Sequence, residues 1–280
     1  MEIITTISGI RGIVKEWKRE GLSIGLVPTM GYLHEGHESL IERAARENDR
    51  VIVSDFVNPI QFGENEDFSS YPRDIEMDSI ISGRAGADIL FCPEGSEMYK
   101  GSFSTFVDLT GPSDRLCAKS RPSHFRGVCT VVSKLFLITE PGRAYFGQKD
   151  AQQLAVIKKM VRDLNFDIEI IGCPIIREED GLAKSSRNSY LSESERRAAA
   201  ILNKALDEGK SLVESGERDC VKIIETIKQK IAQEPLMRID YVEIVSFPEI
   251  EPMAVMDGPI LAAAAVYIGK TRLIDNFIME

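Results

Sequence analysis

Two of the three histidines in the chain, His34 and His37, lie three residues apart near the amino terminus. They follow the apolar run 24–27 and precede a stretch with helical apolar spacing. We therefore expect them at a helix amino terminus, where unpaired N–H groups and a partial positive charge attract anions. Gly36 between them lets a phosphate or a flat base approach the backbone. A metal site and a purely structural pair stay open as alternatives, although the spacing is not His-Glu-x-x-His and His124 is distant in sequence.

Two further clusters carry cations that could neutralise a phosphate. Lys149 and Asp150 lie where a strand-like segment runs into a helical one, and Asp150 could cap that helix or hold Mg²⁺ through oxygen. Lys184 and Arg187 lie in the segment 180–188, whose composition is typical of loops that bind anions and close over them. Each cluster alone has a plainer interpretation, a surface ion pair for the first and a solvated linker for the second.

Charge and motif content exclude several function classes. The chain has 280 residues and a formal net charge of -10, which repels polyphosphate, so we expect no nucleic-acid partner. No Gly-x-Gly-x-x-Gly follows the first strand-like run, and no Gly-x-x-x-x-Gly-Lys-Ser/Thr occurs anywhere. Dinucleotide oxidoreductases and P-loop kinases therefore lose most of their support.

Cysteine usage and apolar run lengths indicate a cytoplasmic protein. The five cysteines are odd in number, scattered and free of any Cys-x-x-Cys pair, so we expect neither a disulfide framework nor a zinc site. The amino-terminal residues lack a basic leader and a small-residue cleavage site. No apolar run approaches the roughly 20 residues of a membrane-spanning helix, so no membrane partner is expected.

Short apolar runs alternate with helical stretches through the first two thirds of the chain. This alternation predicts an α/β, Rossmann-like domain with a doubly wound parallel sheet, whose ligands bind beyond the carboxyl ends of the strands. The expected strands are 24–27, 51–54, 88–91, 143–146 and 168–171, and the expected helices are 38–48, 75–83, 127–139 and 151–164.

The pattern changes after residue 180. Helices expected at 193–215 and 218–232 are followed by strands expected at 241–245, 261–267 and 272–274, which predicts a smaller α+β domain. We place a catalytic domain at residues 1–180 and a lid domain at residues 181–280. The long segment 58–73 is expected to be a binding loop rather than a surface excursion.

Five blocks of the sequence together resemble one family. The block from His34 to His37 alone is shared by the HxGH nucleotidyltransferase superfamily, whereas the others are more specific. With the blocks Pro28 to His37, Phe56 to Phe62, His124 to Val128, Phe146 to Gln153 and Ser185 to Asn188, the chain resembles the pantothenate synthetase family over nearly its whole length.

The resemblance implies an activity and its ligands. Family members condense (R)-pantoate with beta-alanine to pantothenate: the carboxylate first attacks the α-phosphorus of ATP to give pantoyl adenylate and pyrophosphate, and the amine then displaces AMP. Activation is needed because a free carboxylate is a poor electrophile. The implied partners are ATP, pantoate and beta-alanine, with Mg²⁺ as the cofactor, and the implied assembly is a homodimer.

The resemblance also assigns roles to residues. His37 would be the proton donor, with His34, Lys149 and Arg187 completing the catalytic set. Gln61 and Gln153 would bind pantoate, Gln61 would border the beta-alanine position, and Asp150 would lie near Mg²⁺. The ATP site would comprise Met30, Gly31, Tyr32, Leu33, His34, Glu35, Gly36, His37, Gly147, Gln148, Lys149, Asp150, Ile176, Lys184, Ser185, Ser186 and Arg187.

Four positions depart from the family pattern. Lys184 stands where Met is usual, Asp55 takes a usually apolar place, and Ala118 and Ser123 take places that are commonly Gly. Two other functions stay open: a related nucleotidyltransferase that acts on a different acid or phosphate, and a nucleotide-binding module without turnover.

Overall fold

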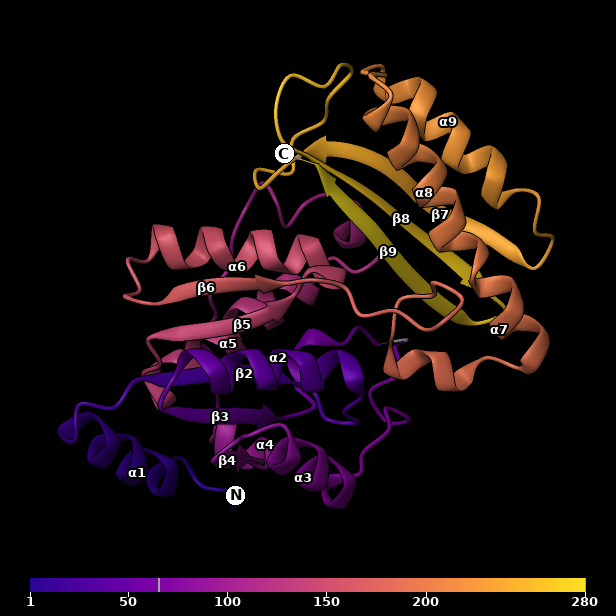
Figure 1. The fold of residues 1–280 in the computed structure, drawn as a ribbon. Helices are drawn as coiled ribbons and strands as arrows, with labels where there is room; N and C mark the ends of the chain where they lie inside the picture. The colour runs from indigo at the N-terminus through magenta and orange to yellow at the C-terminus, as the bar shows by residue number, and fades with distance from the viewer. Residues whose placement is uncertain (65, 280) are drawn as a thin grey trace. The chain divides into compact units, whose positions relative to one another are not determined.

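The computed structural model describes residues 1–64 and 66–279 (Figure 1). The chain groups into two compact units. Unit 1 contains Met1–Thr110, Arg121–Gln148 and Val156–Pro174, and unit 2 contains Gly111–Ser120, Lys149–Ala155 and Ile175–Glu280. The chain thus passes to unit 2 for the last time after Pro174, and two short earlier segments also belong to that unit. The expected domain boundary between residues 180 and 181 stays a prediction.

Unit 1 is built on a six-stranded parallel sheet with the order β1-β4-β3-β2-β5-β6. Every residue of β4 is buried, as are the four central residues of β3, which is typical of strands covered on both faces. The predicted doubly wound α/β fold is confirmed. The strands are β1 (Glu2–Ile4), β2 (Ile24–Thr29), β3 (Arg50–Asp55), β4 (Ile89–Phe91), β5 (Arg143–Gly147) and β6 (Glu169–Cys173).

Local sequence explains where several helices of this unit begin. The side chains of Thr6, His34 and Asp74 each accept a backbone N–H from the first turn of α1, α2 and α3, respectively. The helices are α1 (Ile7–Arg19), α2 (Glu35–Glu47), α3 (Ile75–Arg84), α4 (Gly95–Met98) and α5 (His124–Thr139), with the 3₁₀ turn η1 (Pro59–Gln61). The residues of the 3₁₀ turn η3 (Gln148–Asp150) and of α6 (Ala151–Asp163) are divided between the two units.

The strand order changes direction at β2. The chain runs outward from β2 through β3 to β4 and then returns to place β5 on the other side of β2. The ladder between β2 and β5 covers only Gly25↔Arg143 and Leu26↔Ala144, whereas β2 and β3 pair along six residues each. β2 and β5 therefore stop pairing well before their carboxyl ends, which is the position where open α/β sheets bind ligands.

Unit 2 contains an antiparallel three-stranded sheet with the order β7-β8-β9. Leu202, Leu206, Ile223 and Ile227 of its helices join the apolar side of this sheet in one core. The smaller α+β portion is therefore confirmed. Its elements are η2 (Leu116–Lys119), η4 (Ser186–Tyr190), α7 (Glu193–Ala199), α8 (Ile201–Glu214), α9 (Cys220–Ile231), β7 (Met237–Ser246), β8 (Ile260–Ile268) and β9 (Thr271–Met279).

Some expected elements differ in detail. The helix expected at 193–215 is two helices, α7 and α8, separated at Ala200. Leu164, expected in the helix 151–164, lies one residue beyond the end of α6 and is 51% exposed. Asn65, within the expected binding loop 58–73, lies outside the described residues.

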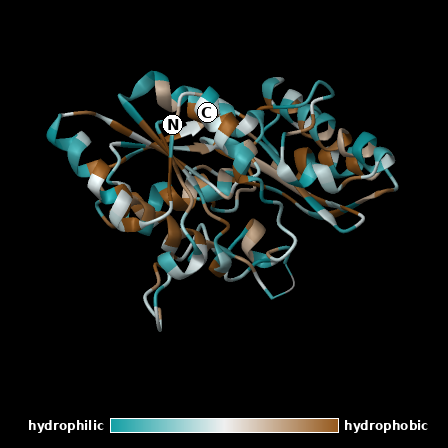
Figure 2. Cartoon of the chain, turned by 90° about the horizontal axis from the view of Figure 1, so that it is seen from below, coloured by the Kyte–Doolittle hydropathy of each residue, from teal (hydrophilic) through white to brown (hydrophobic). Residues whose placement is uncertain are grey.

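The distribution of apolar residues along the chain agrees with these helices and strands. Figure 2 shows hydrophobic and hydrophilic stretches alternating along the helices, as expected of helices with one buried side. α5 is the exception, because thirteen of its sixteen residues are buried. Among the residues that the structure describes, no helix is both long enough and apolar enough to cross a membrane.

Candidate active site

His34 and His37 form a reciprocal cap at the start of α2. His34 is the N-cap residue, with φ −141° and ψ 176°, and its Nδ1 accepts the N–H of Gly36 at 3.1 Å. The N–H of His34 in turn donates to Nδ1 of His37 at 3.3 Å. The two rings lie 4.1 Å apart between centroids, so they pack against each other in the segment that follows β2.

This cap fixes the chemistry of the two rings. Since Nδ1 of each ring accepts a backbone N–H, a neutral ring must carry its proton on Nε2. While the cap is intact, each histidine therefore presents one ring N–H donor at Nε2, and a histidine can change charge near neutral pH. The pair is suited to hydrogen-bonding phosphate oxygens and to moving a proton.

Gln61 is a buried amide held next to residues 30–37, the histidine loop. It is 6% exposed, and its Nε2 lies 2.9 Å from Sδ of Met30 in that loop. Its Oε1 accepts from Nδ2 of Asn58 at 3.0 Å, and its backbone carbonyl lies 3.0 Å from Nδ1 of His124. The side chain therefore has one fixed orientation, with a neutral donor and acceptor rather than a buried charge.

A close backbone approach explains why η1 can lie against α5. A Cβ added to Gly127 would lie 2.5 Å from both Cα of Gln61 and the carbonyl oxygen of Ile60. Asn58 also bonds the carbonyl of Gly127 at 3.2 Å and accepts from the hydroxyl of Tyr99 at 2.6 Å. Only glycine at position 127 permits this contact.

Lys149, Asp150 and Gln153 belong to unit 2. The carbonyl of Lys149 accepts from Nδ2 of Asn276 in β9 at 2.9 Å, which anchors the turn η3. Gln153 is half-buried in α6, while its neighbour Gln152 is buried. Gln152 donates to the carbonyls of Pro112 and Arg115 in the loop before η2 and accepts the N–H of Cys117 within η2. Gln152 is therefore structural, and Gln153 is the one of the two that can serve a ligand.

Asp150 is the candidate metal-binding residue in this turn. Its side chain is exposed. Within residues 1–64 and 66–279, no group of three or more His, Cys, Asp or Glu side chains could hold a metal ion by itself. A single exposed carboxylate nevertheless fits Mg²⁺, because this ion keeps several waters and takes one or two carboxylates together with phosphate oxygens.

Ile176 and the segment 184–187 are brought together in unit 2. The N–H of Lys184 donates to the carbonyl of Ile176 at 2.9 Å, next to the bridge between Arg177 and Ala183. Ser185 caps η4 by accepting the N–H of Arg187 at 3.3 Å. The expected ATP residues of this segment therefore lie on a defined turn and not on a solvated linker.

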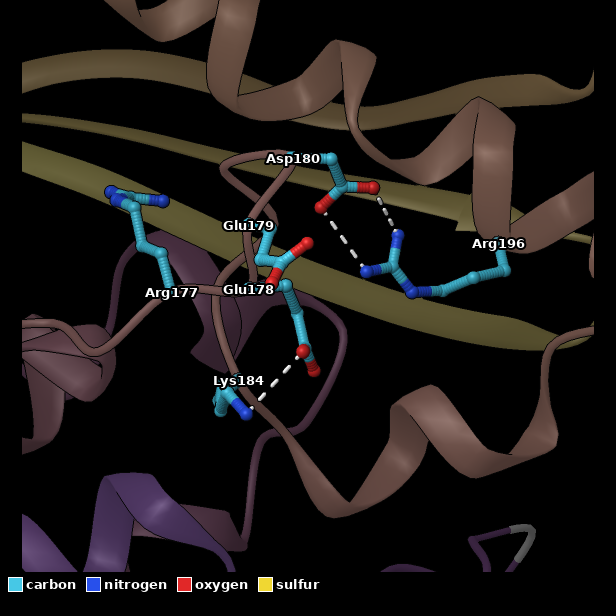
Figure 3. Close-up of a pocket in the computed structure, with 6 residues that line it drawn as sticks. All are labelled: Arg177, Glu178, Glu179, Asp180, Lys184 and Arg196. Atoms are coloured by element: carbon cyan, nitrogen blue, oxygen red, sulfur yellow. Dashed lines mark hydrogen bonds and ion pairs between the residues drawn. The ribbon is translucent and has the colours of Figure 1, made fainter.

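A pocket of about 450 Å³ opens on this turn and is lined by Arg177, Glu178, Glu179, Asp180, Lys184 and Arg196 (Figure 3). Asp180 pairs with Arg196 and Glu178 lies 3.3 Å from Lys184. The Arg196 guanidinium lowers the pKa of Asp180, so this carboxyl stays ionised. The lining carries equal numbers of acidic and basic residues, and the ion pair with Glu178 partly neutralises the charge of Lys184.

The expected site residues thus form two groups. Unit 1 contains the histidine loop 30–37, Gln61, which contacts that loop through Met30, Gly147 at the end of β5 and Gln148 at the start of η3. Unit 2 carries Lys149, Asp150, Gln153, Ile176 and the segment 184–187. Their roles toward substrates stay predictions.

Sequence reasoning missed the residues that hold these groups in place. Asn58, His124 and Gly127 lie in blocks that carried the resemblance, so their presence there was the available signal. Asn276 and Asp275 of β9 had no such signal, because their contacts join segments far apart in the chain.

Comparison with known proteins gives a consistent picture. The sequence model of the family described as Pantoate-beta-alanine ligase matches residues 2–278. The chain is 62% identical over 277 residues to the pantothenate synthetase of Clostridium acetobutylicum, covering 99% of both chains. It is 60% identical over 280 residues to that of Enterococcus faecalis, covering 100% of this chain and 99% of the relative.

Solved structures resemble this fold over the full length. The crystal structure of pantothenate synthetase from Thermus thermophilus matches with a TM-score of 0.94 at 42% identity, covering 99% of both chains. That of the pantoate-beta-alanine ligase from Francisella tularensis, complexed with beta-gamma ATP and beta-alanine, matches with a TM-score of 0.80 at 34% identity, covering 99% of this chain and 97% of the other.

Proposed function

The chain belongs to the pantoate-beta-alanine ligase family, and on that premise we propose that it condenses (R)-pantoate with beta-alanine through a pantoyl adenylate, with release of AMP and pyrophosphate. The chain is thus an enzyme that forms pantothenate, and the proposal concerns the intermediate and the products. The observation that carries it is the match of the family model to residues 2–278.

The histidine loop would bind the triphosphate. An N–H donor on Nε2 of His34 and of His37 would hydrogen-bond phosphate oxygens, and the amino terminus of α2 would add its partial positive charge. As pyrophosphate leaves, His37 would supply a proton to it. The donor is then the protonated ring, which gives up its Nε2 proton and whose Nδ1, while it carries a proton, releases the N–H of His34. Before that step the backbone hydrogen bonds of the cap hold both rings in place.

The cations of unit 2 would neutralise the phosphates. Lys149 would act as a point charge, while Arg187 would hydrogen-bond phosphate oxygens through its planar guanidinium. Lys184, Ser185 and Ser186 would contribute further donors from the same turn. Asp150 would help to hold Mg²⁺, which when bound neutralises phosphate charge.

Two neutral amides would hold the acid. Gln61 and Gln153 would bind the hydroxyl and carboxylate oxygens of pantoate, and Gln61 would also border beta-alanine. The fixed orientation of Gln61 supports this role, because a pre-positioned amide holds the attacking carboxylate without the cost of ordering it.

A coupled assay would test the reaction. With pantoate, ATP and Mg²⁺ alone, we expect pantoate-dependent exchange of labelled pyrophosphate into ATP, and AMP release only after beta-alanine is added. Exchange with another acid in place of pantoate would favour a related nucleotidyltransferase, and ATP binding without exchange would favour a module without turnover. Assembly as a homodimer and a cytoplasmic location stay predictions, which gel filtration with light scattering and cell fractionation would test.

A further inference from the structure

Two carboxyl groups meet directly beneath the histidine loop. Asp55 lies at the carboxyl end of β3 and Asp78 in the first turn of α3, where it is 1% exposed. The two side chains are hydrogen-bonded to each other. A Cβ on Gly31 would clash with Oδ1 of Asp55 and lie 3.1 Å from Oδ2 of Asp78, so the loop backbone rests on this pair.

Asp78 holds the backbone of that loop. Its Oδ2 accepts the N–H of Tyr32 at 2.7 Å and its Oδ1 accepts the N–H of Leu33 at 2.6 Å. Gly31 and Tyr32 both have positive φ, 78° and 53°, and a left-handed conformation costs a tyrosine of order 1 kcal/mol or more. Two short hydrogen bonds to a carboxylate offset that cost and fix the residues that lead into His34.

The pair can persist only while it shares a proton. Two carboxylates in contact cannot both ionise without strong repulsion. Because both oxygens of Asp78 accept backbone N–H groups, the proton belongs to Asp55, which donates to Asp78. Burial and then the charge of Asp78 raise the pKa of Asp55 to about 7.

Arg73, Asp74 and Cys92 are ionisable groups that act on this pair. Arg73 lowers the pKa of Asp55, while Asp74 opposes ionisation of Asp78. Sγ of Cys92 lies 4.0 Å from Oδ2 of Asp55, and burial raises the pKa of that thiol to about 12, so it stays neutral. None of these groups replaces the proton of Asp55.

We propose that Asp78 is a positioning residue for the histidine loop and that the proton held by Asp55 keeps the two carboxyl groups together beneath it. The consequence for nucleotide binding rests on the proposed function, whereas the consequence for folding does not. The two can therefore be tested separately.

Folding stability across pH tests the shared proton. A free aspartate loses its proton near pH 3.9, so between about pH 4 and pH 7 the folded chain binds one proton more at Asp55 than the unfolded chain. The stabilisation that this proton provides is complete at low pH and lost as pH rises toward 7. Asp55→Asn keeps an N–H donor but cannot titrate.

We therefore expect urea unfolding to give a pH-dependent ratio of unfolding constants between Asp55→Asn and wild type. The unfolding constant of Asp55→Asn divided by that of wild type should fall by roughly three- to tenfold per pH unit between pH 5 and pH 7 and level off above pH 7. Titrating groups that do not interact with Asp55 are common to both proteins and cancel. A ratio that stays constant from pH 5 to pH 8 overturns the shared proton.

Nucleotide affinity tests the positioning. Asp78→Asn leaves the N–H of Tyr32 or of Leu33 facing an amide N–H, and we expect the dissociation constant of a non-hydrolysable ATP analogue to rise at least tenfold. Asp74→Asn is the matched control, because it removes a charge from the start of the same helix but keeps the cap on Met77. Unchanged affinity in folded Asp78→Asn overturns the positioning role.

Asp55→Asn provides a second test should Asp78→Asn fail to fold. Wild-type affinity should weaken several-fold more than that of Asp55→Asn between pH 6 and pH 8, because ionised Asp55 places a second negative charge beneath a phosphate-binding loop. Ionisation of the nucleotide affects both proteins equally. Parallel pH profiles contradict the proposal, whereas no binding of the analogue by wild type would contradict the proposed function and leave the unfolding test intact.

Discussion

His37 has two contacts that a substitution would remove together. Its Nδ1 holds the N–H of His34, and its Nε2–H would reach a phosphate oxygen. His37→Ala should therefore lose about 1 kcal/mol of unfolding free energy through the cap and reduce kcat about 10²–10³-fold through the lost donor. Urea unfolding and AMP release would measure the two effects separately.

A neighbouring serine gives the control for His37→Ala. Oγ of Ser39 donates to the carbonyl of Gly36 at 2.8 Å, so Ser39→Ala disturbs the same turn without touching either ring. We expect near wild-type turnover from it and the 10²–10³-fold loss, about 3–4 kcal/mol, from Lys149→Ala and Arg187→Ala. A His37→Ala enzyme with wild-type turnover would remove the histidine from the proposed mechanism.

The sequence reveals reactive side chains better than the residues that hold them. His34 and His37 stand out because histidine is rare in this chain and the two are closely spaced, whereas Lys149 stands out only within a block that resembles the family. Asp78 and Asn276 do not, because an aspartate in a helix and an asparagine in a strand are ordinary until distant backbone groups approach them. Asp55 was visible only as a charge in an apolar run, and its partner was not predictable.

The close contact between α5 and η1 predicts that a single methyl group added at Gly127 destabilises the protein. Gly127→Ala must push η1 away, because the new Cβ would meet backbone and not a flexible side chain. We expect a loss of about 1–3 kcal/mol in unfolding free energy and a higher KM for pantoate, since Gln61 moves with η1. Urea unfolding and steady-state kinetics at saturating ATP would measure both.

Gly12 in α1 is the matched control, because it is also a helical glycine and a Cβ there would meet nothing within 4 Å. Gly12→Ala should stabilise the chain by about 0.5–1 kcal/mol through helix propensity and leave KM unchanged. Equal effects of the two substitutions would show that the approach of Gly127 to Gln61 does not constrain η1.

β9 supports the turn that carries Lys184 through an ion pair. Asp275, 1% exposed, receives both terminal nitrogens of Arg177 at 2.6 and 3.0 Å, and Arg177 also donates to the carbonyl of Gly181 at 3.0 Å. Asp275→Asn should cost roughly 3 kcal/mol, because it leaves a partly buried guanidinium without its countercharge. Urea unfolding would measure this loss.

Replacing both partners separates stability from positioning. The double variant Arg177→Met with Asp275→Leu should regain most of the lost stability, because no buried charge remains, yet it still lacks the donor to Gly181. Its affinity for an ATP analogue should therefore stay below that of wild type. Full recovery of both properties would mean that the ion pair contributes nothing to the turn.

The positions of strands were predictable where burial requires a continuous run of apolar residues. The five expected strands of the first two thirds of the chain each overlap an observed strand. β2 to β5 are largely buried and need continuous apolar runs, whereas β6, at the edge of the sheet, is mostly half-buried. β1 was missed because it has three residues, two of them exposed, at the edge of the sheet. The break at Ala200 was missed because alanine is a good helix former and gives no stop signal.

Across the whole molecule, burial determines the chemical reactivity of the cysteine thiols. All five are free, four are buried, and Cys92 is half-buried. Burial raises the pKa of Cys92 and of Cys129 to about 12 and also raises the pKa values of Cys173 and Cys220. A thiol with a pKa of about 12 has roughly 10³-fold less thiolate at pH 8 than an ordinary cysteine, and only the thiolate reacts.

We therefore expect slow labelling of these thiols in the native protein at pH 8 and rapid labelling of all five in urea, measured by a chromogenic disulfide reagent. Because the raised pKa values keep the thiols neutral, labelling should accelerate about tenfold per pH unit between pH 7 and pH 9. The melting temperature should be the same with and without a reductant, since no disulfide contributes to folding. A lower melting temperature in reductant would reveal a cross-link, and native labelling as fast as in urea would mean that the core around Cys129 opens faster than its burial indicates.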